Sequence, residues 1–260
     1  MQTLQAEELR ALKFYEGDIA AADRNDPFWG DARAYVTLNA LLYDDLASEY
    51  TRVLEGKQLN PAMLRDLPRL LGLYGALFSA MQKGEKSKAR TGYRVERASD
   101  FAVCLQRGET VAFTSTALDG FLPAYGDKQG LVLLTCHVPA KTPCAIFSEM
   151  LDSYLKSSEN EMLLPPFLRF RAEARPLTDS DRRITDLSGE PPQAAYDLRF
   201  EPEQSLRICD DIAALPDAAE AAARLYAQIQ QGTPESALNP ADRAAYLQFK
   251  RALVRALRGS

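Results

Sequence analysis

The spacing of apolar residues changes twice along the chain and divides it into three parts. Up to residue 90, apolar residues recur three and four positions apart, as they do between Leu38 and Leu46, and this is the spacing of amphipathic helices. Short apolar runs then predict strands, and helical spacing returns near the C-terminus. We therefore predict an N-terminal helical region at 1–90, a β-rich core at 91–202 and a C-terminal helical extension at 203–260.

Residues that favour helix ends locate the helices of the first part. The first long helical pattern ends at Gly56. In the next pattern, Asn60 is a preferred N-cap and Pro61 occupies the first helical position, where its missing N–H is not needed. Pro68 lies inside that pattern and implies a kink or two shorter helices, because it cannot donate an intrahelical hydrogen bond. Gly84 is the expected end of the pattern.

The middle part consists of short apolar runs separated by loops rich in Gly, Pro, Asp and Ser, which predict a compact domain with a mixed or antiparallel sheet. The predicted strands are residues 92–97, 109–115, 130–138, 144–147, 161–164, 168–175 and 194–201. In the last part, Asn239 and Pro240 begin a long alanine-rich helix. The expected fold class is α+β.

Composition and charge narrow the functional classes. The chain has 260 residues, of which 46% are hydrophobic and 26% charged. This length allows one large domain or one domain with a helical extension, and we favour the second. The formal net charge is −5, and the 31 Lys and Arg residues are scattered along the chain. Nucleic-acid-binding proteins usually gather basic residues in a stripe, so nucleic acid is not an expected partner.

The sequence gives no support for metal or membrane chemistry. The four cysteines are too far apart to supply paired zinc ligands, and His137 is the single histidine. We expect the cysteines to be small buried residues in a reducing compartment. No run approaches the ~20 apolar residues of a membrane span, and the polar N-terminus lacks a signal-peptide core. The protein is therefore expected to be made in the cytosol, and export would need a route independent of such a signal.

The stretch SSENEMLLPP places two carboxylates one residue apart, directly before an apolar run. In an extended strand, residues i and i+2 point to the same face, so Glu159 and Glu161 are expected to face one cleft. Two like charges held close together perturb each other's pKa, which catalytic sites often require. The alternative is an ordinary solvated strand face. The pair becomes informative in combination with two earlier segments.

Two segments before the glutamate pair complete a pattern. In GYRVER, Arg94 follows an aromatic residue on a predicted strand, and VAFTSTALD ends in the hydroxyls of Thr114, Ser115 and Thr116. Each segment alone is typical of a surface arginine or a turn cap. Arginine, then the Ser-Thr step, then Glu-x-Glu before Leu-Leu-Pro resembles the R-S-E class of mono-ADP-ribosyltransferases, the cholera-toxin-like and clostridial-toxin-like enzymes. The resemblance extends over roughly residues 33–200.

The resemblance implies a fold, a co-substrate and a partner. Residues 91–202, together with about 33–90, would form one ADP-ribosyltransferase domain with a two-sheet β core. The enzyme would be a glycosyltransferase that uses NAD as co-substrate, needs no metal and releases nicotinamide. It would modify a target protein, most often on arginine, with threonine and other side chains also possible. The chain would then be a bacterial toxin or effector, secreted into the cytosol of a host cell.

NAD chemistry fits the residue types of the pattern. Cleavage of the nicotinamide N-glycosidic bond creates an oxocarbenium-like ribose, which an anion beneath it stabilises. Glu161 would be that anion, and by the resemblance it would also bind the ribose 2′-hydroxyl. A planar guanidinium suits a pyrophosphate, so Arg94 would bind NAD there. By the same resemblance, Ser115 would orient the Glu161 carboxylate, and Glu159 would orient and deprotonate the attacking acceptor.

The resemblance assigns further contacts with NAD. Val95 stands where the family often has a glycine whose backbone binds nicotinamide, and the backbone of any residue offers the same groups. Thr116 belongs to the expected cofactor contacts, whereas Ala117 removes the third hydroxyl of the family's Ser-Thr-Ser motif. Phe121 or Tyr125 would stack on nicotinamide, or either would simply be part of the core.

Tyr154, in the segment SEMLDSYLKSS, would be the exposed aromatic residue that touches the target protein; the alternative is packing under its own loop. Two other functions stay open at this point. An NAD glycohydrolase would pass ADP-ribose to water, and a non-catalytic binding module would use the same fold or its flanking helices without turnover. Nicotinamide release without a protein adduct would favour the first, and absence of NAD binding would favour the second.

Overall fold

The computed structural model describes residues 3–17, 23–29, 34–54, 56–57, 59–84, 88–121, 130–151, 160–186, 188–201 and 215–258. The chain forms two compact units, Met81–Ser205 together with Met1–Leu4, and Gln5–Ala80 together with Leu206–Ser260. The strands of the described residues all lie in the first unit. Within the same residues, no helix is long and apolar enough to cross a membrane.

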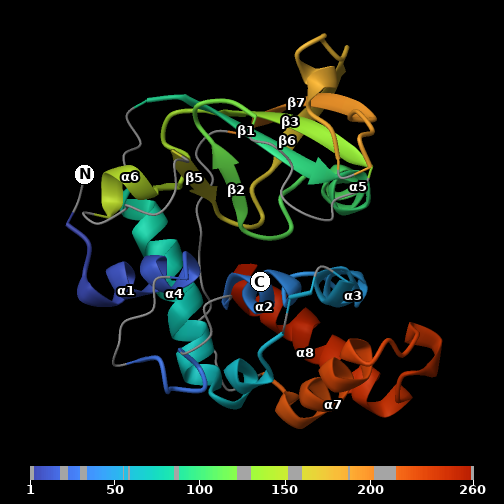
Figure 1. The fold of residues 1–260 in the computed structure, drawn as a ribbon. Coiled ribbons are helices and arrows are strands. Elements are labelled where there is room, and N and C mark those ends of the chain that lie inside the picture. The colour runs from blue at the N-terminus through green and yellow to red at the C-terminus, as the bar shows by residue number, and fades with distance from the viewer. Residues whose placement is uncertain are drawn as a thin grey trace. The chain divides into compact units, whose positions relative to one another are not determined.

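The first unit is built on one seven-stranded sheet (Figure 1). The strands are β1 (Arg90–Arg97), β2 (Thr114–Ala117), β3 (Leu131–Val138), β4 (Ala145–Ile146), β5 (Glu161–Leu164), β6 (Phe170–Arg175) and β7 (Ala194–Phe200). Their order across the sheet is β4-β5-β2-β1-β3-β7-β6, and only β3 and β7 pair in parallel. Helices α5 (Ala98–Arg107) and α6 (Phe147–Met150) and the 3-10 helix η3 (Asp181–Arg183) connect strands.

The α+β class is confirmed, but the prediction of a two-sheet core is wrong, because β1 joins both halves into one sheet. One edge of β1 pairs with β3 along the full length of the strand. The other edge meets β2 where Tyr93 lies opposite Ala117. A glycine permits this close approach, since a Cβ atom at Gly92 would lie 2.4 Å from Oγ1 of Thr116. The strand that carries Arg94 is therefore shared by both halves.

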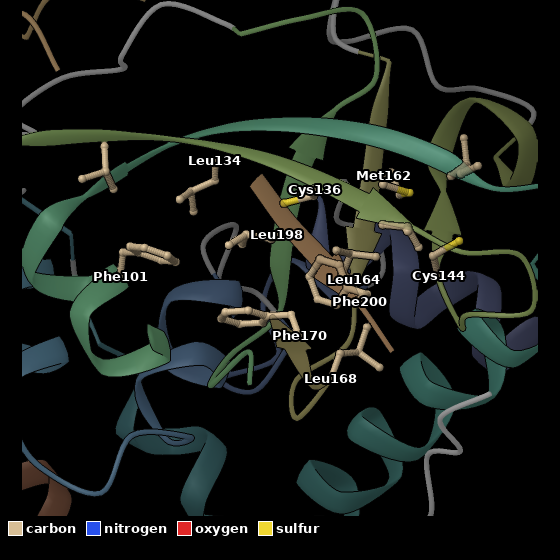
Figure 2. Close-up of a cluster of buried hydrophobic side chains, with 13 residues drawn as sticks. Phe101, Leu134, Cys136, Cys144, Met162, Leu164, Leu168, Phe170, Leu198 and Phe200 are labelled. Carbon is tan, nitrogen blue, oxygen red and sulfur yellow. The ribbon is translucent and has the colours of Figure 1, made fainter. Parts of the chain in front are cut away.

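The sheet buries apolar residues on both faces, between which successive side chains alternate. Face A is the side that carries Leu134 and Met162, and face B is the side that carries Val95 and Leu133. Face A forms the larger core and packs against α5 through Phe101 (Figure 2). Side chains from the connection between β6 and β7 pack against the smaller cluster on face B. Burial on both faces explains why the central strands read as continuous apolar runs.

The predicted strands agree with the sheet in part. Each overlaps a strand, and residues 161–164 coincide with β5. The prediction at 109–115 begins too early, because only an isolated bridge between Glu109 and Arg169 forms before β2 starts at Thr114. Helix α5 occupies a stretch for which no element is predicted. It ends at Gly108, whose φ of 64° is the left-handed conformation that glycine adopts without strain.

The second unit consists of helices from both ends of the chain. They are α1 (Ala6–Tyr15), α2 (Ala34–Ala40), α3 (Ala47–Leu54), η2 (Pro61–Arg65), most of α4 (Leu67–Lys83), α7 (Ala219–Gln230), η5 (Glu235–Ala237) and α8 (Pro240–Arg258). Helix α7 packs on η2, α3 and α8 (Figure 1). The C-terminal helices thus share a core with helices from the N-terminal part.

Caps explain the helix boundaries of this unit. Oδ1 of Asn60 accepts a hydrogen bond from the Ala62 amide at 3.0 Å, and Oδ1 of Asn239 accepts one from the Ala241 amide at 2.9 Å. Both predicted N-caps are therefore confirmed. The pattern around Pro68 is divided into η2 and α4, which confirms the prediction of two shorter helices.

The long helical pattern that ends at Gly56 contains two helices rather than one. Helix α2 ends before the turn, and α3 begins at Ala47. Oδ1 of Asp45 accepts a hydrogen bond from the Ala47 amide at 3.1 Å. Aspartate side chains bond to nearby amides in this way and so favour a turn and a new start over a continuous helix.

Candidate active site

The predicted catalytic residues Ser115 and Glu161 lie on neighbouring strands and share face B. Strands β2 and β5 pair with Ala117 opposite Glu161 and with Ser115 opposite Leu163. Ser115 and Glu161 are therefore diagonal neighbours, and across the ~7–8 Å between such positions a long side chain can reach its neighbour. Both residues are half-buried. The sheet thus brings a carboxylate and a hydroxyl to one place on its surface.

Arg94 supports the strand that carries Ser115. Its Nη1 donates to the carbonyl oxygen of Ser115 at 2.8 Å, and its Nε donates to the Glu96 carboxylate at 2.6 Å. Its Nη2 forms an ion pair with the same carboxylate. Arg94 lies opposite Leu134 and so points to face A, away from the Ser115 side chain. In this arrangement, the guanidinium holds the backbone of β2 against β1.

Thr116 is oriented differently from Ser115. Its side chain is 1% exposed on face A, where its hydroxyl donates to the carbonyl oxygen of Met162 at 3.0 Å. This hydrogen bond runs from β2 to β5 and reinforces the ladder that carries Glu161. The sheet therefore brings Ser115 and Glu161 together and places Thr116 on the opposite side.

An aromatic pair stands beside the two catalytic candidates. Glu161, Ala117 and Tyr93 form a line across β5, β2 and β1 on face B, and neighbouring strands are about 4.8 Å apart. The ring of Phe121 meets the ring of Tyr93 edge-on, with 5.2 Å between centroids, and packs against the cluster that contains Val95. Tyr93 is not among the predicted site residues. The signal for it is alternation, because the neighbour of Arg94 must point to the other face.

The predictions for Tyr125, Tyr154 and Glu159 fall outside the described residues and stay predictions. The backbone next to Glu161 is described: the Leu118 amide donates to the carbonyl oxygen of Asn160 at 2.8 Å. Pairing between the two segments therefore continues one residue beyond Glu161.

Other reactive side chains of the first unit lie apart from this position. Nε2 of His137 lies 3.5 Å from Oδ1 of Asp197, beside a hollow of about 320 Å³ at the ends of β1, β3 and β7. Burial raises the pKa of the Cys104 thiol to about 11 and that of Cys136 to about 12. Both thiols are therefore protonated at neutral pH and are poor nucleophiles. The prediction of buried cysteines is confirmed for Cys136 and Cys144, whereas Cys104 is only partly buried and Cys209 falls outside the described residues.

No protein-family model matches the chain, and no curated protein matches it. Among solved structures, the ADP-ribosylating toxin BECa of a C. perfringens binary enterotoxin, with NADH, is 15% identical with a TM-score of 0.46. The match covers 76% of this chain and 44% of BECa, so the chain spans less than half the length of that protein.

Two further structures are matched over most of their own length. C3stau2 from S. aureus, with NAD, is 14% identical with a TM-score of 0.42, over 76% of this chain and 88% of that one. Plx2a, an ADP-ribosyltransferase toxin from Paenibacillus larvae, is 13% identical with a TM-score of 0.38, and the match covers 77% of this chain and 100% of Plx2a. Over about three quarters of its length, the chain is thus similar in structure to bacterial ADP-ribosylating toxins.

Proposed function

We propose that this chain is an NAD-dependent mono-ADP-ribosyltransferase that transfers ADP-ribose to a side chain of a target protein and releases nicotinamide. The observation that carries the proposal is the shared face of Ser115 and Glu161, which the pairing of β2 with β5 makes diagonal neighbours. The aromatic pair of Tyr93 and Phe121 stands on the same face. In the cleavage of a nicotinamide glycoside, a carboxylate can stabilise the positive charge that develops, a hydroxyl can orient that carboxylate, and an aromatic surface can stack on nicotinamide.

In this proposal, Glu161 supplies negative charge where positive charge develops. As the bond between nicotinamide and ribose breaks, the ribose becomes oxocarbenium-like, and the Glu161 carboxylate stabilises it and binds the 2′-hydroxyl. Ser115 donates a hydrogen bond that orients this carboxylate. Phe121 or Tyr125 stacks on nicotinamide, and the backbone of Val95 binds its amide.

Arg94 connects substrate binding to the position of Ser115. The guanidinium points to face A and already holds the Ser115 carbonyl oxygen and the Glu96 carboxylate, so in this proposal the pyrophosphate of NAD reaches Arg94 from that side of the sheet. A planar guanidinium has five donor hydrogens, so it can serve several acceptors at once. Thr116 contributes by its hydrogen bond to β5 rather than by pointing into the same face as Ser115.

The acceptor half of the reaction is assigned to the residues before β5. Glu159 orients and deprotonates the attacking side chain, and Tyr154 contacts the target protein. Arginine is the proposed acceptor, with threonine and other side chains as alternatives. We also propose that the catalytic domain comprises 91–202 with about 33–90. The chain would act as a bacterial toxin or effector in the cytosol of a host cell.

The test of this function is incubation of the purified chain with labelled NAD and a host-cell lysate, followed by mass spectrometry of labelled proteins and an assay for nicotinamide. Transfer predicts both released nicotinamide and an adduct on a defined residue. Nicotinamide without any adduct would identify a glycohydrolase. Absence of both products, together with absence of NAD binding in calorimetry, would identify a non-catalytic binding module.

We expect Glu159→Gln to separate transfer from hydrolysis. The amide keeps the shape of the side chain and removes the base, so protein modification should fall by about 10²-fold or more while slow release of nicotinamide survives. Adduct formation and nicotinamide release, measured in parallel on the same preparation, give the comparison. Equal loss of both activities would mean that Glu159 and Glu161 act as one coupled acidic site.

We expect Arg94→Lys to weaken NAD binding although it retains the positive charge. Lysine cannot present two parallel donors to a pyrophosphate and cannot keep both contacts of the guanidinium. Calorimetry of NAD binding measures the effect. Arg171→Lys, an exposed residue of β6, is the matched control and should bind NAD normally. An unchanged Kd in Arg94→Lys would limit Arg94 to holding the backbone of Ser115.

A further inference from the structure

The pairing between the segments that carry Ser115 and Glu161 is interrupted and then resumes in the same register. Thr114 lies opposite Leu164 at the end of β2 and β5, and an isolated bridge places Glu109 opposite Arg169. Each strand advances five residues between these two pairs. The interruption contains Pro165 and its neighbour Pro166, which have no N–H to donate to a ladder. Some other group must hold the two segments together across this gap.

Thr110 provides that connection with both its backbone and its side chain. Its amide donates to the carbonyl oxygen of Leu168 at 2.9 Å, and its carbonyl oxygen accepts from the Phe167 amide at 2.6 Å. Its hydroxyl donates to the carbonyl oxygen of Pro165 at 3.0 Å and accepts from the Leu168 amide at 3.0 Å. The hydroxyl therefore adds two hydrogen bonds between the segments at the point where the prolines cannot donate.

These hydrogen bonds are buried and lie next to a residue with a strained backbone conformation. Thr110 is 3% exposed, so groups that lose their partner there cannot turn to water without a rearrangement. Phe167 has a φ of 67°, which is a rare conformation for an aromatic residue and persists only where the surroundings enforce it. The contacts of Thr110 with the turn supply such enforcement.

We propose that Thr110 is a positioning residue that fixes the register of β5 against β2 and thereby holds Glu161 beside Ser115. The proposal rests on the proposed function of Glu161. Side chains alternate with a period of two, so a slip of one residue would move Glu161 from face B to face A. A partial loss of pairing would displace the carboxylate, and a displacement of about 1 Å costs on the order of 10²-fold in rate.

The test replaces Thr110 by valine, which keeps the branched shape and removes the hydroxyl. We expect kcat for nicotinamide release to fall by about 10- to 100-fold, while KM for NAD changes less than about twofold. Thr110→Ser retains the hydroxyl and should keep most of kcat. If the valine variant does not fold, Thr110→Cys keeps a weak donor and acceptor and should give an intermediate kcat.

A matched control separates positioning from general packing. Thr142 is also buried, at 2% exposed, and its hydroxyl has no hydrogen-bond partner among the described residues. Thr142→Val therefore makes the same chemical change without breaking a contact, and it should leave kcat unchanged. Equal kcat in Thr110→Val and the wild type, or equal losses in the two valine variants, would overturn the proposal.

The register of β5 against β2 can be measured without an activity assay. The result therefore does not depend on whether the proposed function is correct. The Leu118 amide donates to Asn160, and Ala117 is the partner of Glu161. We expect Thr110→Val to reduce protection of the Leu118 amide from hydrogen exchange and to weaken the backbone nuclear Overhauser contact between Ala117 and Glu161. If the wild type releases no nicotinamide, the proposed function fails. Unchanged protection and contact in Thr110→Val would then refute the positioning proposal separately.

Discussion

Glu161→Gln is expected to lower both nicotinamide release and protein modification by at least about 10²-fold. Loss of one well-placed electrostatic group in a preorganised site has effects of this size. Both activities fall together because both need the same bond to break, whereas Glu159→Gln is expected to affect only transfer. The assays are nicotinamide release and adduct formation at saturating NAD.

The folded state should survive this substitution. Glu161 is half-buried at the first position of β5, and the glutamine side chain has nearly the same shape. The pairing of the strand depends on backbone hydrogen bonds and on the buried residues that follow it. We therefore expect the unfolding midpoint to change little, so that a loss of activity reports chemistry rather than unfolding.

Glu173→Gln is the matched control for charge. Glu173 lies on β6 and its side chain is 63% exposed, so the change removes one carboxylate from the same sheet without touching β5. Its turnover should equal that of the wild type. Near-normal turnover in Glu161→Gln would refute the assignment of Glu161 and leave the Ser115 neighbourhood without a catalytic anion.

The sequence predicts the strands of the sheet far better than the way in which they pair. Residues 161–164 and 130–138 are recognisable because their apolar runs are local. The single sheet depends on contacts between distant segments, namely the pairing of β1 with both β2 and β3. No local pattern encodes which strand edges meet, and the two-sheet core, which was expected from the family resemblance and not from the strand patterns, is wrong because the strands form one sheet.

The candidate site also has features that the local sequence predicts and features that it does not. Its residue types can be read from the sequence, and so can the face of each side chain relative to its strand neighbours. That Ser115 is diagonal to Glu161 follows only from the register of β2 and β5, which joins residues far apart in the chain. The bridging hydroxyl of Thr110 is equally non-local, because its importance depends on two prolines 55 and 56 positions later in the sequence.

The helical unit contains the other non-local feature, a buried ion pair between its N-terminal and C-terminal parts. Nζ of Lys250, on α8, lies 2.6 Å from Oε1 of Glu49, on α3, and both side chains are fully buried. Tyr246 donates to the same Oε1 at 2.8 Å, and Lys250 also donates to the carbonyl oxygen of Asp45 at 2.6 Å. The hydroxyls of Tyr226 and Tyr246 are 2.5 Å apart. This cluster links α3, α7 and α8.

We expect Lys250→Met to destabilise this unit by about 3–5 kcal/mol. Methionine fills much of the same volume but leaves the Glu49 carboxylate buried without its cation, and loss of one partner of a buried pair has effects of this size. Urea unfolding followed by tryptophan fluorescence measures the change in this unit, because Trp29 is the single tryptophan of the chain and packs there against Phe14.

The double variant Glu49→Gln/Lys250→Met and the pH dependence identify the buried charge as the cause. The double variant buries no ion and should regain most of the lost stability.

Burial already raises the pKa of Glu49 above its usual 4.5, against the opposing effect of Lys250, so removal of Lys250 should raise the pKa of Glu49 further. A raised folded-state pKa means that the folded state binds the proton more tightly than the unfolded state. The loss in Lys250→Met should therefore be largest at neutral pH and should shrink as the pH falls towards 4.5. A loss that persists in the double variant and does not change with pH would instead indicate that packing of the lysine side chain holds α8 against α3.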